Sequence, residues 1–154
     1  MVRWPILILA PTLIGVMMLG GVALAVTKTC TTNPCEGTSG PDTLTGNASK
    51  NQIYGRSDAD YIAGRAAADR LHGNLGNDEV WGEVGADFID GGMHSDSDRL
   101  YGGSGNDTIR AVDELNGWED YVDCGDGTDT AYVDELDVVE NCETVFRTPP
   151  EEPL

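Results

Sequence analysis

A glycine recurs every nine residues through the middle of this chain, and this period limits the folds that the chain can adopt. The period is clearest in Gly73–Asp90, which reads GNLGNDEVW and then GEVGADFID. Each copy has glycine at positions one and four, aspartate at position six and an apolar residue at position eight. Position one is glycine at 37, 46, 55, 64, 73, 82 and 91 and, after one eleven-residue unit, at 102. Position eight is aliphatic in all eight units: Leu44, Ile53, Ile62, Leu71, Val80, Ile89, Leu100 and Ile109.

One apolar residue in nine fits neither an amphipathic helix nor an ordinary alternating strand. Positions seven to nine can form a short strand that points its central side chain inward, and the six residues before them can form a turn. Two units then complete one coil with two strands. Successive coils are expected to stack as a parallel β-solenoid, which is stabilised by stacking because a single unit buries almost nothing.

The turns are expected to depend on glycine, which accepts positive φ and lets two backbones approach closely. The predicted turn glycines are Gly37, Gly40, Gly55, Gly73, Gly76, Gly82, Gly85, Gly91, Gly102 and Gly105. In three units position four is Ser49, Asp58 or Ala67 instead. Left-handed geometry is tolerated by Asp58 and poorly by Ala67.

The units GNLGNDEVW, GEVGADFID and GGSGNDTIR resemble the G-G-x-G-x-D-x-U-x nonapeptide of the repeat-in-toxin (RTX), hemolysin-type calcium-binding family. The resemblance is close over Gly37–Arg110 and looser at Cys124–Tyr132, which reads CGDGTDTAY. The layout is also similar to that of small exported actinobacterial calcium-binding proteins. The resemblance implies an all-β fold, a parallel β-roll (right-handed β-solenoid) of nine-residue repeats, with several bound Ca²⁺ ions.

Position six carries an oxygen-bearing side chain in every unit, and its spacing suits calcium. Ca²⁺ takes about six to eight oxygen ligands, and turns two units apart should lie on one edge of the roll, roughly 4.8 Å apart. An ion between such turns can take one aspartate from each and further oxygens from backbone carbonyls. We therefore predict two rows of ligands, with Asp42, Asp60, Asp78 and Asp98 on one edge and Asn51, Asp69, Asp87 and Asp107 on the other. Asp129, in CGDGTDTAY, is a further candidate ligand.

The alternative is a metal-free solenoid, in which these aspartates only hydrogen-bond their own turns. Charge argues against it. The chain has 9 Lys and Arg against 27 Asp and Glu, a formal net charge of −18, which disfavours nucleic acid as a partner and favours cations. Two carboxylates about 4.8 Å apart repel by roughly 3.5 kcal/mol at an effective dielectric constant of about 20. Because so acidic a composition is also typical of disorder, we expect the chain to be largely disordered without calcium and to fold as ions bind.

The ends of the chain differ from the repeats. Residues 1–25 read as a signal peptide, in which Arg3 precedes an apolar run and Ala23–Ala25 forms an A-x-A cleavage pattern. The alternative is an uncleaved anchor, the only case in which we expect contact with a membrane. Residues 26–36 form a leader with a cysteine pair, 37–110 the calcium-binding β-roll, 111–145 an irregular coil and a C-terminal cap, and 146–154 a disordered tail.

The four cysteines allow three connectivities. An oxidising compartment favours disulfides over free thiols, and proximity in the sequence favours Cys30–Cys35 and Cys124–Cys142. The second of these would lock the C-terminal cap.

Together these features predict a secreted, extracellular or cell-surface-associated calcium-binding protein that is not an enzyme. The chain contains no H-E-x-x-H and no G-x-S-x-G motif. The alternative is a calcium-dependent surface adhesin for a glycan or protein partner, because Trp81 and Tyr101 fall in one outward row, next to the pair Glu79 and Arg99. Cross-strand packing is the simpler explanation of that row.

Overall fold

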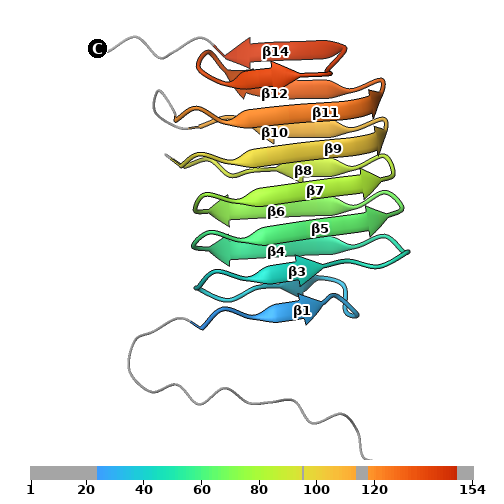
Figure 1. Cartoon of the computed structure of the whole chain (residues 1–154), viewed down its shortest axis with the longest axis vertical. Helices are drawn as coiled ribbons and strands as arrows, with labels where there is room; N and C mark the ends of the chain where they lie inside the picture. The colour runs from blue at the N-terminus through green and yellow to red at the C-terminus, as the bar shows by residue number, and fades with distance from the viewer. Residues whose placement is uncertain (1–23, 95, 114–117, 149–154) are drawn as a thin grey trace, which may run out of the picture.

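The computed structural model describes residues 24–94, 96–113 and 118–148, and over these residues the chain winds as a parallel β-solenoid (Figure 1). Two seven-stranded sheets form its opposite sides. One sheet contains, in spatial order, β1 (Thr27–Thr29), β3 (Thr43–Thr45), β5 (Tyr61–Ala66), β7 (Glu79–Val84), β9 (Arg99–Gly105), β11 (Tyr121–Gly127) and β13 (Val138–Glu140). The other contains β2 (Cys35–Glu36), β4 (Gln52–Ser57), β6 (Arg70–Leu75), β8 (Phe88–Asp90), β10 (Thr108–Ala111), β12 (Thr130–Asp134) and β14 (Thr144–Thr148). The predicted all-β solenoid is confirmed.

Successive coils stack in the register that the repeat predicts. Ile62 of β5 pairs with Val80 of β7, and Val80 pairs with Leu100 of β9. The eleven-residue unit lies between β8 and β9, and its two extra residues leave the pairing of the strands intact. Register is therefore decided by the inward aliphatic residues, while the turns absorb differences in length.

The outward row that contains Trp81 and Tyr101 is cross-strand packing. Their rings stack with centroids 3.8 Å apart and planes 11° apart, so each ring covers a face of the other. Glu79 and Arg99 are register partners on the same two strands, as expected.

The core is a thin row of aliphatic side chains along the inside of each sheet. Positions six and eight and the following position one point inward, because alternate residues of a strand lie on one face. In the repeats, each strand thus presents the position-six side chain, an aliphatic residue and a glycine to the interior. The position-eight residues are all 0 % exposed: Leu44, Ile53, Ile62, Leu71, Val80, Ile89, Leu100 and Ile109.

Both sheets continue beyond Arg110. β11 pairs with β9, β12 with β10, β13 with β11 and β14 with β12. Position one is occupied here by Ala111, Cys124 and Val133, each at most 1 % exposed. The inward alternation therefore survives where the glycine period is lost. At the other end the leader also joins the sheets, since β1 pairs with β3 and β2 with β4.

Both predicted disulfides are present. Cys30 and Cys35, with Cα atoms 5.5 Å apart, close the first coil. Cys124 and Cys142, with Cα atoms 5.1 Å apart, join the unit that begins at Cys124 to the last turn. Cys30, Cys35 and Cys124 are fully buried and form part of the core.

The predicted signal peptide lies outside the described residues except for Leu24 and Ala25. Of the predicted tail at 146–154, residues 146–148 belong to strand β14, and the rest lies outside the described residues. Within the part of the chain that the structure describes, no helix has the length and hydropathy needed to cross a membrane.

Candidate metal centre

The position-six aspartates form two hydrogen-bonded rows, which we call the first and second ladders. In each ladder, one carboxylate oxygen (Oδ1) of an aspartate accepts a hydrogen bond from the backbone N–H of the equivalent residue in the preceding coil. In the first ladder these N–H to Oδ1 distances are 2.7 Å for Asp42 to Asp60, 2.8 Å for Asp60 to Asp78 and 2.8 Å for Asp78 to Asp98. In the second they are 2.7 Å for Asn51 to Asp69, 2.7 Å for Asp69 to Asp87 and 2.8 Å for Asp87 to Asp107.

The aspartates that the sequence singles out as ligands are therefore brought together in two separate rows, one on each edge of the roll. Asp78 is linked to Asp60 and Asp98, and no hydrogen bond joins it to Asp87. Their role as calcium ligands stays a prediction.

In most of the ladder aspartates, one carboxylate oxygen is buried without a hydrogen-bond partner. The eight predicted aspartate ligands, Asp129 included, are at most 4 % exposed. The second carboxylate oxygen (Oδ2) has no hydrogen-bond donor in Asp60, Asp69, Asp78, Asp87, Asp107 and Asp129. A buried polar atom without a partner costs free energy, and carboxylate oxygens are the hard donors that Ca²⁺ prefers. The residues thus suit the ion that the repeat implies.

Burial also raises the pKa of these carboxyl groups. The pKa rises from 3.8 to about 8 for Asp78 and Asp98, chiefly through desolvation and, to a smaller extent, through repulsion from neighbouring aspartates. For Asp60, Asp69, Asp87 and Asp107 it rises to about 6, again mainly through desolvation. In every case the hydrogen bond from the neighbouring backbone N–H opposes the shift. A cation beside the ladder would favour the ionised form and reverse this cost.

Position one must be glycine because a carboxylate oxygen and a backbone carbonyl lie too close to it to leave room for a Cβ. A Cβ added to Gly55 would lie 2.2 Å from Oδ2 of Asp60 and 2.7 Å from the carbonyl oxygen of Gly73 in the next coil. The same crowding by the unit's own position-six side chain and a neighbouring carbonyl occurs at Gly37, Gly46, Gly64, Gly73, Gly82 and Gly102. The aspartate carboxylate therefore occupies the space that a side chain at position one would need.

Positive φ occurs at position four in the units of residues 55–90, though not at Gly40 or Ser49, and it also occurs at position two. At position four φ is 117° for Gly76, 71° for Asp58 and 77° for Ala67. At position two it is 91° for Arg56 and 81° for Arg65. The sequence did not predict the second group, because arginine has no preference for a left-handed backbone.

Three further carboxylates extend the ladders. In the first, Asp98 N–H donates to Asp120 Oδ1 (2.8 Å) and Asp120 N–H to Asp137 Oδ1 (3.1 Å). In the second, Asp107 N–H donates to Asp129 Oδ1 (2.7 Å) and Asp129 N–H to Glu143 Oε2 (2.7 Å). Sequence analysis missed Asp120, Asp137 and Glu143 because no glycine precedes them at the repeat spacing. The signal that remains is an acidic residue two positions before Val122, Val139 or Val145.

No group of three or more His, Cys, Asp or Glu side chains that could hold a metal ion occurs among the described residues. Any ion bound at a ladder must therefore combine two successive carboxylates with backbone carbonyls or water.

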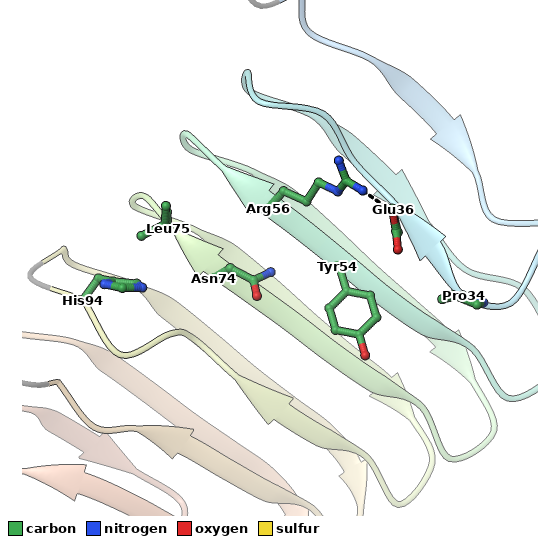
Figure 2. Close-up of a pocket in the computed structure, with 7 residues that line it drawn as sticks. All are labelled: Pro34, Glu36, Tyr54, Arg56, Asn74, Leu75 and His94. Atoms are coloured by element: carbon green, nitrogen blue, oxygen red, sulfur yellow. Dashed lines mark hydrogen bonds and ion pairs between the residues drawn. The ribbon is translucent and has the colours of Figure 1, made fainter.

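An open depression elsewhere, lined by Pro34, Glu36, Tyr54, Arg56, Asn74, Leu75 and His94, contains an Arg56–Glu36 ion pair (Figure 2). It holds one histidine and one carboxylate, and Figure 2 shows them at opposite ends of the depression.

Comparison with known proteins agrees with the geometry. The family model for the RTX calcium-binding nonapeptide repeat matches residues 36–71, 63–93 and 94–111. No curated protein and no solved structure matches the chain. The matched residues are those that form the stacked turns between β2 and β10, and they carry the position-six aspartates from Asp42 to Asp107. Through residues 36–111, the chain belongs to the RTX calcium-binding nonapeptide-repeat family.

Proposed function

We propose that this protein is a secreted, non-catalytic calcium-binding protein whose β-roll folds as calcium binds. The observation that carries the proposal is the state of the ladder carboxylates. One carboxylate oxygen of each of these aspartates accepts a backbone N–H of the preceding coil, whereas the other is buried without a hydrogen-bond donor in Asp60, Asp69, Asp78, Asp87 and Asp107. A hard divalent cation satisfies such oxygens.

The ligands would come from neighbouring coils. Asp42, Asp60, Asp78 and Asp98 would hold ions along the first ladder, and Asp69, Asp87 and Asp107 along the second. When bound, Ca²⁺ supplies the positive charge that offsets repulsion between successive carboxylates. Each aspartate also accepts a hydrogen bond from the adjacent coil, so fixing one carboxylate helps to hold the next coil in register. We therefore expect binding and folding to be cooperative.

The absence of catalysis is supported by how the histidines are placed. Nδ1 of His72 lies 3.7 Å from Oδ2 of Asp90, too far for the hydrogen bond by which a carboxylate orients a catalytic imidazole. His94 lines the open depression, at the end opposite to Glu36, the one carboxylate among the lining residues.

We infer secretion from the apolar N-terminus. The backbone nitrogen of Val26 donates to Oδ1 of Asp42 at 2.7 Å. If the signal peptide is removed after Ala25, this nitrogen becomes a positively charged terminus beside the first aspartate of the ladder. Mass spectrometry of the exported chain should then find Val26 as its first residue.

Calcium titration followed by far-UV circular dichroism tests the proposal. At about pH 8, where the ladder carboxyl groups are losing their protons, the β-sheet signal should develop as Ca²⁺ is added and disappear on chelation. Mg²⁺ should not replace Ca²⁺, because it requires a smaller octahedral shell and gives up its water reluctantly. The variant Asp60→Asn should need more Ca²⁺ to fold, whereas Asp58→Asn, an exposed residue in the same turn, should not.

A spectrum that chelation leaves unchanged would refute calcium-dependent folding. A chain that carries no Ca²⁺ in native mass spectrometry would refute calcium binding itself.

A further inference from the structure

We propose an additional calcium site at the C-terminal end of the roll, formed by Asp129 and Glu143 and held together by the Cys124–Cys142 disulfide. The site lies beyond residues 36–111, which the repeat family matches. The inference rests on calcium binding by the ladders, as proposed above, and extends it to a glutamate outside the nonapeptide pattern.

Asp129 has the environment of an aspartate within the repeats. It is 0 % exposed, its Oδ1 accepts the backbone N–H of Asp107 at 2.7 Å, and its Oδ2 is buried with no hydrogen-bond partner. The unpartnered oxygen is therefore available to a ligand that carries positive charge. Because the residue is entirely enclosed, leaving this oxygen unsatisfied is costly.

Glu143 takes the place of the next aspartate. Its Oε2 accepts the backbone N–H of Asp129 at 2.7 Å, which is the contact that an aspartate Oδ1 makes elsewhere in the ladder. The backbone repeats too, since Thr144 N–H donates to the carbonyl of Asp129 at 3.0 Å, as Thr130 N–H does to that of Asp107. Glu143 comes four residues after Val139, whereas Asp129 comes seven residues after the equivalent Val122, so the longer side chain of glutamate compensates for a shorter turn.

The disulfide joins strand β11, which leads into the turn of Asp129, to the last turn. Cys124 lies within β11, and Cys142 directly precedes Glu143. The bond therefore limits how far the last turn can move from the coil beneath it. We infer that Glu143 is held at the site by this bond, and that reduction of the disulfide releases the terminal ion and leaves those of the repeats in place.

Native mass spectrometry of the full chain, at about 1 mM free Ca²⁺, a concentration at which extracellular modules bind, counts the ions in each variant. Glu143→Gln should bind one ion fewer than the wild type, and Asp129→Asn at least one fewer. Glu135→Gln, another exposed glutamate of the last coils, should retain the wild-type number. Since Glu143 is itself exposed, its substitution leaves the core intact and keeps the test valid even if Asp129→Asn does not fold.

The disulfide is tested in the same assay. Replacing Cys124 and Cys142 together with serine should remove the terminal ion, whereas replacing Cys30 and Cys35 together should not. If Glu143→Gln binds as many ions as the wild type, the site is refuted. If the Cys124/Cys142 variant keeps every ion, the positioning role of the disulfide is refuted. A wild-type chain that binds no ion would instead refute the proposed function.

Discussion

Without calcium, the roll should become less stable as pH rises. Burial raises the pKa of Asp78, Asp98 and Asp120 from 3.8 to about 8. Between about pH 5 and pH 8 these groups hold a proton in the folded chain and have lost it in the unfolded chain. The folded state binds more protons, so its stability falls with increasing pH. At about 1.4 kcal/mol per pH unit, an interval of about three units costs roughly 4 kcal/mol for each group. Three such groups approach the whole stability of a typical domain, about 5–15 kcal/mol.

Urea unfolding in excess chelator, followed by far-UV circular dichroism from about pH 5 up to the pH at which the calcium-free chain no longer folds, measures the effect. The unfolding midpoint should fall as pH rises, and saturating Ca²⁺ should remove most of the fall because the ion favours the ionised carboxylate. Asp78→Asn should reduce the loss of stability by about 4 kcal/mol over the same interval. Asn51→Asp, which adds a carboxylate to the second ladder, should increase it. A midpoint in chelator that is constant or rises with pH would contradict the reasoning, as would an unaltered pH dependence in Asp78→Asn.

Two further predictions concern the turns. Gly73→Ala should destabilise the calcium-bound roll by about 1–3 kcal/mol, because the new Cβ would lie 2.2 Å from Oδ2 of Asp78. In thermal unfolding, Leu75→Ala, in the same strand and 41 % exposed, should cost much less. Equal costs would contradict the steric argument. Ala67→Gly should stabilise the roll by about 1 kcal/mol, since it removes a left-handed alanine at φ 77°. The control Ala59→Gly, at a residue without positive φ, should destabilise it instead, and a loss of stability in Ala67→Gly would argue against stored strain at that turn.

The core and the ladders could be predicted from the sequence because their residues recur at the same positions in every nine-residue unit. Ile62 and Val80 occupy the same place in units that are two apart, and so do Asp60 and Asp78. In a solenoid with two units per coil, residues that are two units apart in the sequence lie next to each other on adjacent coils. The left-handed backbone at Arg65 could not be predicted in this way. Its positive φ is imposed by stacking, because neighbouring coils must follow the same backbone path. Arginine itself has no preference for that conformation.

The sequence by itself determined the nine-residue register, the inward aliphatic row and the two rows of aspartates, because each unit states the same pattern of inward and outward residues. Only the tertiary structure decided how far the roll extends. Asp120, Asp137 and Glu143 come eleven, six and four residues after the preceding residue equivalent to position eight, instead of the seven in the nine-residue units. Each nevertheless lies over the equivalent residue of the preceding coil. The physical reason is that a strand pairs with its neighbour through hydrogen bonds and buried side chains, and these contacts do not depend on how many turn residues precede the strand.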